Sequence, residues 1–130
     1  MKNHYFTNDH EWIDFQGTVA YIGVCNYKLL RLKKIDKIVF SKGPGVQKRG
    51  DVLAIIYSQN YKIPVHMPVD GKIMNLNDKL LLTDLGNFLH QAEKDRWLAI
   101  IGLAQPFERK GLMQVEQYKH FIKKNPQDLS

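Results

Sequence analysis

The sequence predicts a mainly β domain with short helices and a longer helix near the C-terminus. Short segments rich in β-forming residues alternate with turns that contain glycine, proline or asparagine. The longest apolar runs, residues 52–57 and 97–104, have the length of strands and fall far short of the roughly 18–20 residues of a membrane span. Apolar residues spaced three and four apart predict a helix over Gln114–Lys124.

Composition supports a single globular domain over residues 1–130. A chain of 130 residues with 44% hydrophobic and 25% charged residues can build a core, which excludes a disordered chain. Nine glycines and five prolines exclude a collagen-like chain. The lone cysteine, Cys25, excludes an internal disulfide, and the first residues lack the apolar stretch of a signal peptide. We therefore expect a cytoplasmic protein without a membrane segment.

The N-terminal part predicts a hairpin followed by a helix. Residues 10–15 and 18–24 are strand-like and flank a tight turn at Gln16-Gly17. Asn26 is placed to cap a short helix over Tyr27–Lys34.

Further strands and breaks follow along the chain. Strands are expected at Lys37–Phe40, Val52–Tyr57, Ile63–Met67, Lys72–Met74 and Trp97–Leu103. The Leu-rich stretch Asp78–His90 predicts one or two short helices, interrupted near Thr83-Asp84 or Gly86. Glycine and proline predict breaks at Gly43-Pro44-Gly45 and at Pro106.

No group of residues in the sequence forms a recognisable catalytic centre. Asp9-His10-Glu11 contains three metal-ligating residue types, but neighbours on a strand point to opposite faces, so we interpret it as a solvated strand start. The loop between Gly45 and Gly50 lacks the Lys-Ser/Thr of a phosphate-binding loop. Cys25 fits a small buried hydrophobic residue better than an activated thiol. The chain is therefore not expected to be an enzyme.

The order of several motifs is more specific. The segment Phe6–Trp12 reads aromatic-Thr-x-x-His-Glu-Trp. Gly50-Asp51 then precedes an apolar strand, and Pro68-Val69-Asp70-Gly71 follows that strand and the next one. Over about residues 5–124 the chain resembles the glycine cleavage system H proteins.

This resemblance implies a fold and a carrier function. The expected fold is the lipoyl-domain type, a flattened antiparallel barrel or sandwich (the barrel-sandwich hybrid). An H protein is not an enzyme and carries lipoate on a lysine at a hairpin tip. The implied partners are glycine decarboxylase, aminomethyltransferase and the lipoylation enzymes.

The hairpin motif departs from the family at its essential residue. Where the family reads Glu-Ser-x-Lys, this chain reads Tyr57-Ser58-Gln59-Asn60. Only Ser58 matches. Lipoylation acylates a primary amine, and the Asn60 side chain is already a carboxamide whose nitrogen is not nucleophilic. We therefore expect no lipoate at this position, and a binding or regulatory module related to glycine cleavage.

Two alternatives remain open. Lys62 lies two residues further on, and a reshaped turn at Asn60 would bring it to the tip as the lipoyl lysine of a genuine aminomethyl carrier. The net charge of +6 also allows a nucleic-acid-binding module, although no aromatic stacking motif accompanies the basic residues. Those basic residues are Lys28, Arg31, Lys33, Lys34 and Lys37, with Lys42, Lys48 and Arg49.

Overall fold

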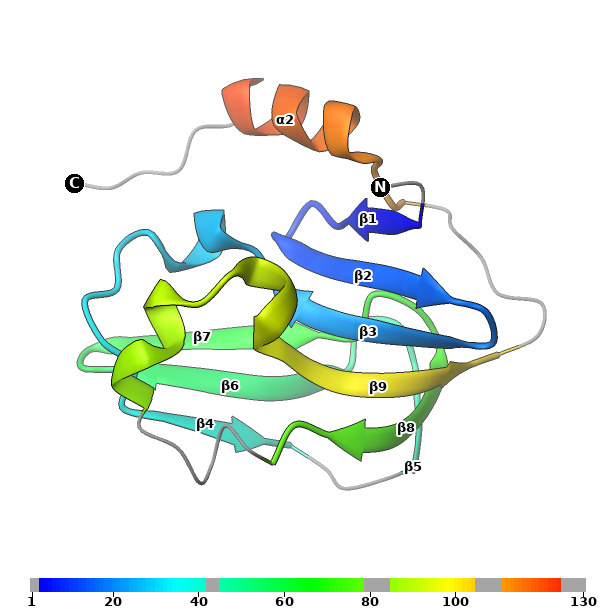
Figure 1. Cartoon of the computed structure of the whole chain (residues 1–130), viewed down its shortest axis with the longest axis horizontal. Helices are drawn as coiled ribbons and strands as arrows, with labels where there is room; N and C mark the ends of the chain where they lie inside the picture. Colours follow the sequence, from blue (N-terminus) through cyan, green and yellow to red (C-terminus); the bar gives the residue numbers. More distant parts are fainter. Residues whose placement is uncertain (1–2, 42–44, 79–84, 105–110, 125–130) are drawn as a thin grey trace.

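The computed structural model describes residues 3–41, 45–78, 85–104 and 111–124, which form two antiparallel β-sheets (Figure 1). The larger sheet has the strand order β1-β2-β3-β9-β8-β5, and the smaller has the order β4-β6-β7. The strands are β1 (His4–Phe6), β2 (Glu11–Gln16), β3 (Val19–Val24), β4 (Lys37–Phe40), β5 (Gly45–Gln47), β6 (Val52–Ser58), β7 (Tyr61–His66), β8 (Gly71–Leu76) and β9 (Trp97–Leu103). The helices are the 3₁₀ helices η1 (Asn26–Leu29), η2 (Leu85–His90) and η3 (Glu93–Arg96), and the α-helix α2 (Val115–Lys124).

This architecture confirms the predicted mainly β fold with short helices and a C-terminal helix. The strands divide between two sheets instead of joining in one closed barrel. Each of the seven expected strand segments is present. The short elements β1, β5 and η3 were not predicted, because three or four residues carry no readable period; β4 is equally short but was predicted from its run of β-forming residues. Residues 79–84 of the predicted Leu-rich helices, the break at Gly43-Pro44 and Pro106 lie outside the described residues.

The hairpin of β2 and β3 explains why its sequence alternates imperfectly. Gly17 has φ +68°, which glycine adopts without strain, and it closes the predicted tight turn. Ile13 and Phe15 enter the main core between the two sheets, while Trp12 is buried on the opposite face. Because both faces of β2 are covered, apolar residues occupy successive positions.

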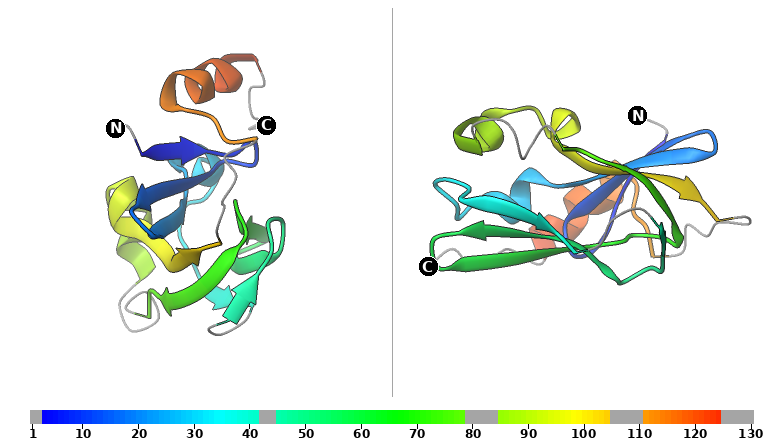
Figure 2. Two further views of the ribbon diagram at one scale, coloured as in Figure 1. Left: turned by 90° about the vertical axis from the view of Figure 1, so that its right-hand side faces the viewer. Right: turned by 90° about the horizontal axis from the view of Figure 1, so that it is seen from below.

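A second apolar cluster lies between α2 and the outer face of the larger sheet. Figure 2 shows α2 beside β1 at one edge of the molecule. The Phe6 and Tyr118 rings stack with centroids 4.5 Å apart, and the Tyr118 hydroxyl lies 2.8 Å from His10 Nδ1. The predicted C-terminal helix is therefore confirmed, and its apolar stripe is covered on the sheet side. No helix in the described ranges is long and apolar enough to span a membrane.

The helix predicted over Tyr27–Lys34 is wrong in length and in its cap. Only Asn26–Leu29 is helical, and Cys25 holds the N-cap position without a side-chain hydrogen bond. The Asn26 carboxamide instead accepts a hydrogen bond from Arg96. Asp36 already donates its N–H to the Tyr57 carbonyl at 2.8 Å, so the chain must extend after η1 to join β6.

Cys25 is buried within the outer cluster, as predicted. Burial raises the pKa of its thiol well above the ordinary value. The side chain therefore packs as a small hydrophobic group and supplies no nucleophile.

Two histidines near this cluster should make stability depend on pH. Burial lowers the pKa of both His4 and His10. In the unfolded chain both titrate near about 6.5, so below that pH the unfolded state binds more protons than the folded state. We expect the free energy of unfolding to be fully retained above about pH 7 and to fall as the pH drops through the lowered values.

Urea unfolding between about pH 5 and pH 7.5 measures this dependence. His10 has φ +64°, a conformation that asparagine tolerates, so His10→Asn should flatten the curve without straining the backbone. An unchanged slope in this variant would contradict the assignment.

Candidate functional site

The hairpin of β6 and β7 forms the candidate site. Its last cross-strand pair is Ser58 with Tyr61, which leaves Gln59 and Asn60 as a two-residue turn. Gln59 has φ +50°, and both turn residues are exposed. In Figures 1 and 2 this turn lies at the same end of the molecule as the segment between η1 and β4. The apex therefore presents the Asn60 carboxamide, which exchanges hydrogen bonds but forms no acyl linkage.

Hydrogen bonds fix the conformation of this turn. Ser58 is only 2% exposed, and its hydroxyl donates to the Lys34 carbonyl. The Gln59 N–H donates to Asp36 Oδ2 at 2.6 Å. The segment between η1 and β4 thus holds the hairpin tip through these two hydrogen bonds. The turn contains only Gln59 and Asn60, so Lys62 does not reach the apex.

Lys62 lies inside β7, directly opposite Tyr57. Its Nζ is 5.9 Å from the centroid of the Tyr57 ring, and Lys37 Nζ lies 4.9 Å from the same centroid. Such cation–π contacts contribute about 0.5–1 kcal/mol at exposed sites. Tyr57 occupies the position of the glutamate in the family motif. Two lysine amines, instead of a carboxylate, therefore lie around this side chain beside the tip.

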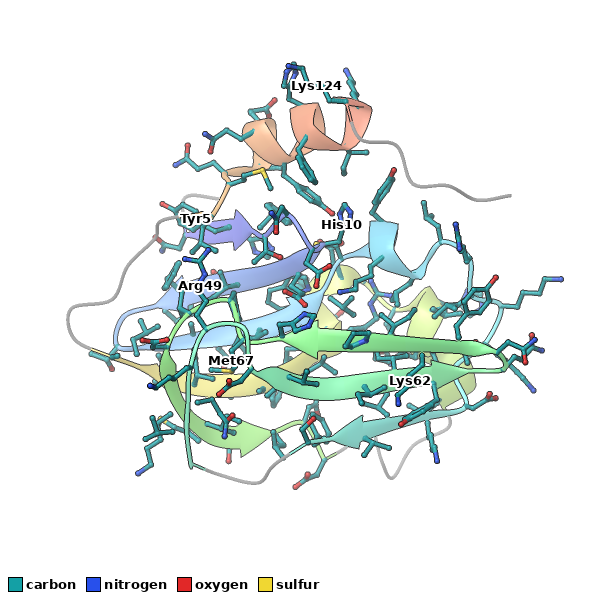
Figure 3. The ribbon with its side chains drawn as sticks, turned by 180° about the vertical axis from the view of Figure 1, so that it is seen from behind. Tyr5, His10, Arg49, Lys62, Met67 and Lys124 are labelled. Carbon is teal, nitrogen blue, oxygen red and sulfur yellow. The ribbon has the colours of Figure 1, made fainter. Side chains whose placement is uncertain are left out.

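A surface cavity of about 310 Å³ lies beside Lys62. Figure 3 shows this lysine on the three-stranded sheet, far from Lys124 on α2. Cationic and apolar side chains line it together. The lining residues are Lys28, Arg31, Leu32, Tyr61, Lys62, Ile63 and Pro64.

The basic segment is partly neutralised by carboxylates. Lys28 Nζ lies 3.2 Å from Asp9 Oδ2 and 3.4 Å from Glu11 Oε2. Lys34 Nζ lies 3.8 Å from Asp36 Oδ1. Lys42 falls outside the described residues. Lys37 and Lys62 beside the Tyr57 ring, and Arg31 in the wall of the cavity, also bring positive charge to this side of the tip.

The structure separates the three residues of Asp9-His10-Glu11. His10 turns toward Tyr118, whereas Asp9 and Glu11 meet His66 from β7. Glu11 is buried, so the interpretation of this segment as a solvated strand start is wrong for Glu11. His10 is separated from the other two, as expected, but the reason is its left-handed backbone (φ +64°) in the turn before β2 and not strand alternation. His66 is 55 positions away from Glu11 and carries no local signal.

Comparison with known proteins identifies the family. The family described as "Glycine cleavage H-protein" matches residues 4–125. The glycine cleavage system H protein of Thermoanaerobacter sp. (strain X514) is 30% identical over 122 residues, covering 94% of this chain and 95% of that protein. The H protein of Caulobacter vibrioides is 32% identical over 118 residues, covering 90% and 96%.

A solved structure shares the fold. The crystal structure of a glycine cleavage system H protein from Mycobacterium marinum superimposes with a TM-score of 0.74 at 16% identity, covering 96% of this chain and 98% of that chain. The arrangement of sheets is thus the lipoyl-domain, barrel-sandwich type. H proteins are carriers and not enzymes. The chain belongs to the glycine cleavage H-protein family.

Proposed function

We propose that this chain is a binding module of the H-protein family that carries no lipoyl group. The observation that carries the proposal is Asn60 at the apex of the β6–β7 turn, where the family resemblance places the modified lysine. A carboxamide cannot take the place of an amine in forming the lipoyl amide. In this proposal the folded domain, without the arm, keeps a surface that binds the enzymes that handle H proteins.

The fixed tip and its charge support a docking role. Gln59 is held by Asp36, so little ordering is required when a partner binds. Lys37 and Lys62 flank the Tyr57 ring, and this cation-aromatic patch suits an acidic partner surface. The proposed partners are glycine decarboxylase, aminomethyltransferase or a lipoylation enzyme of the same cell. A single buried cysteine fits a cytoplasmic setting.

The lipoylation state is tested by intact mass. The chain is produced in lipoate-replete cells together with a lipoate ligase, and a lipoylated H protein serves as the positive control. We expect no lipoyl increment on this chain. An increment mapped to Lys62 would establish the genuine aminomethyl carrier and overturn the proposal.

Docking is tested by titration of the purified partners. We expect saturable binding that weakens with salt, and Lys37→Glu with Lys62→Glu should raise Kd by about tenfold or more. Lys124→Glu on α2 is the matched control and should leave Kd unchanged. Absence of binding to all three partners, or equal weakening by the control, would overturn the docking role. Tighter binding to oligonucleotides than to these enzymes would favour the nucleic-acid alternative.

A further inference from the structure

A cluster of carboxylate and imidazole groups joins the two sheets at the far end of β7. Glu11 begins β2 in the larger sheet, Asp9 precedes it, and His66 ends β7 in the smaller sheet. His66 Nδ1 lies 2.8 Å from Asp9 Oδ2 and 3.0 Å from Glu11 Oε2. His66 is five residues along β7 from Tyr61, roughly 17 Å at strand spacing, so the cluster is separate from the hairpin tip.

We propose that Asp9, Glu11 and His66 bind a divalent transition-metal ion, with Zn²⁺ the best fit. One ligand atom from each residue lies within 4.8 Å of the other two. Imidazole nitrogen and carboxylate oxygen are ordinary zinc ligands, and ligand atoms around a tetrahedral zinc lie roughly 3.3 Å apart. The two separations from the imidazole, 2.8 and 3.0 Å, need to widen by a few tenths of an ångström. The ligand atoms of the three residues lie within 4.8 Å of one another, so the exposed Asp9 carboxylate must move toward Glu11 to close the site.

Burial and hydrogen bonds fix the orientation of the Glu11 carboxylate, as is common for metal ligands. Its carboxylate is 2% exposed. It accepts a hydrogen bond from the His66 backbone N–H at 2.7 Å, and its other oxygen accepts one from the Thr7 hydroxyl at 3.2 Å. Such outer contacts orient a ligating group and are a regular feature of metal sites.

Lys28 now supplies the positive charge that a metal ion would supply. Its Nζ lies 3.2 and 3.4 Å from the two carboxylates, beyond the roughly 2.7–2.9 Å of a strong charge-assisted hydrogen bond. Two carboxylates therefore share one ammonium group, which donates a long hydrogen bond to each of them. A dication bound at about 2.1 Å would have to displace this amine.

The imidazole and the neighbouring cavity suit a three-ligand site with an open fourth position. Two carboxylate oxygens contact Nδ1, so this nitrogen carries the proton in the metal-free protein. Coordination through Nδ1 needs the tautomer with the proton on Nε2. A cavity of about 250 Å³, lined by Thr7, Asn8, Asp9, Glu11 and His66 and, among others, by the cationic Arg49, leaves room for a water molecule at the fourth position.

Isothermal titration with ZnCl₂ after EDTA treatment tests the site, with thermal melting as a second readout. We expect one Zn²⁺ per chain and a melting temperature that rises with zinc concentration. His66→Ala and Asp9→Asn should each weaken binding about tenfold or more. His120→Ala removes an exposed histidine from α2 and should leave the affinity unchanged.

Lys28→Met gives an independent test that does not remove a ligand. Without the competing ammonium group, zinc should bind about tenfold more tightly, while melting in EDTA reports any loss of fold. No zinc binding by the wild-type chain would overturn the proposal. So would equal loss in His120→Ala and His66→Ala, or an unchanged or lower affinity in folded Lys28→Met.

Discussion

Replacing Gly23 by alanine is expected to destabilise the protein by about 1–3 kcal/mol. A Cβ at this position would lie 2.3 Å from Cζ2 and 2.6 Å from Nε1 of Trp12, its cross-strand partner. Trp12 is 1% exposed, and its ring stacks on His4 with centroids 5.1 Å apart. The indole therefore has no room to move aside, and the added methyl group must shift β2 or β3.

Urea unfolding with a matched glycine control measures this effect. Gly102→Ala places a Cβ 3.1 Å from the sulfur of Met74, an exposed side chain that can move, so its cost should be smaller. The double variant Gly23→Ala with Trp12→Phe replaces the indole by a smaller ring. It should recover part of the lost free energy of unfolding and give a coupling energy of about 0.5–3 kcal/mol between the two positions. Equal costs in the two alanine variants, with no coupling, would refute the steric explanation.

Restoring an amine at the hairpin tip should produce the largest change in chemistry. We expect Asn60→Lys to gain a lipoyl group in cells that contain a lipoate ligase, because the two-residue turn presents this position at the apex. Tyr57→Glu combined with Asn60→Lys restores the family acid as well and should raise the modified fraction further. Intact mass and peptide mapping report both outcomes.

Two controls locate the modification. Asn60→Gln keeps a carboxamide and should stay unmodified. Lys62→Arg combined with Asn60→Lys removes the nearby native amine and should still be modified. If folded Asn60→Lys and its Tyr57→Glu combination both remain unmodified, the apex is not recognised by these enzymes, and the lack of lipoate has a cause beyond Asn60.

Local patterns predicted the regular elements whose signal lies within one segment. The β2–β3 hairpin follows from Gly17 between two β-rich segments, and β9 follows from the apolar run at Trp97–Leu103. The C-terminal helix follows from its spacing of apolar residues. The helix over Tyr27–Lys34 failed because Asn26 is engaged by Arg96, 70 positions away, and tertiary contacts override local preference.

The candidate site divides in the same way. Motif order located the hairpin and placed Asn60 at the family position, and the structure adds that the turn holds only two residues. The contact of Lys62 with Tyr57 follows from strand register, which the turn length sets. The meeting of Glu11 with His66 depends on how the two sheets pack, and no local pattern encodes that packing.

The burial of the lone sulfhydryl has a practical consequence. Cys25 shares its cluster with Phe6, Trp12 and Tyr118, so reagent reaches the sulfur only when α2 or its neighbours lift from the sheet. The rate of alkylation by a neutral maleimide therefore reports how often this side of the molecule opens. Alkylation of Cys25 can therefore show whether a docking partner stabilises or loosens the packing of α2, and no additional cysteine has to be introduced.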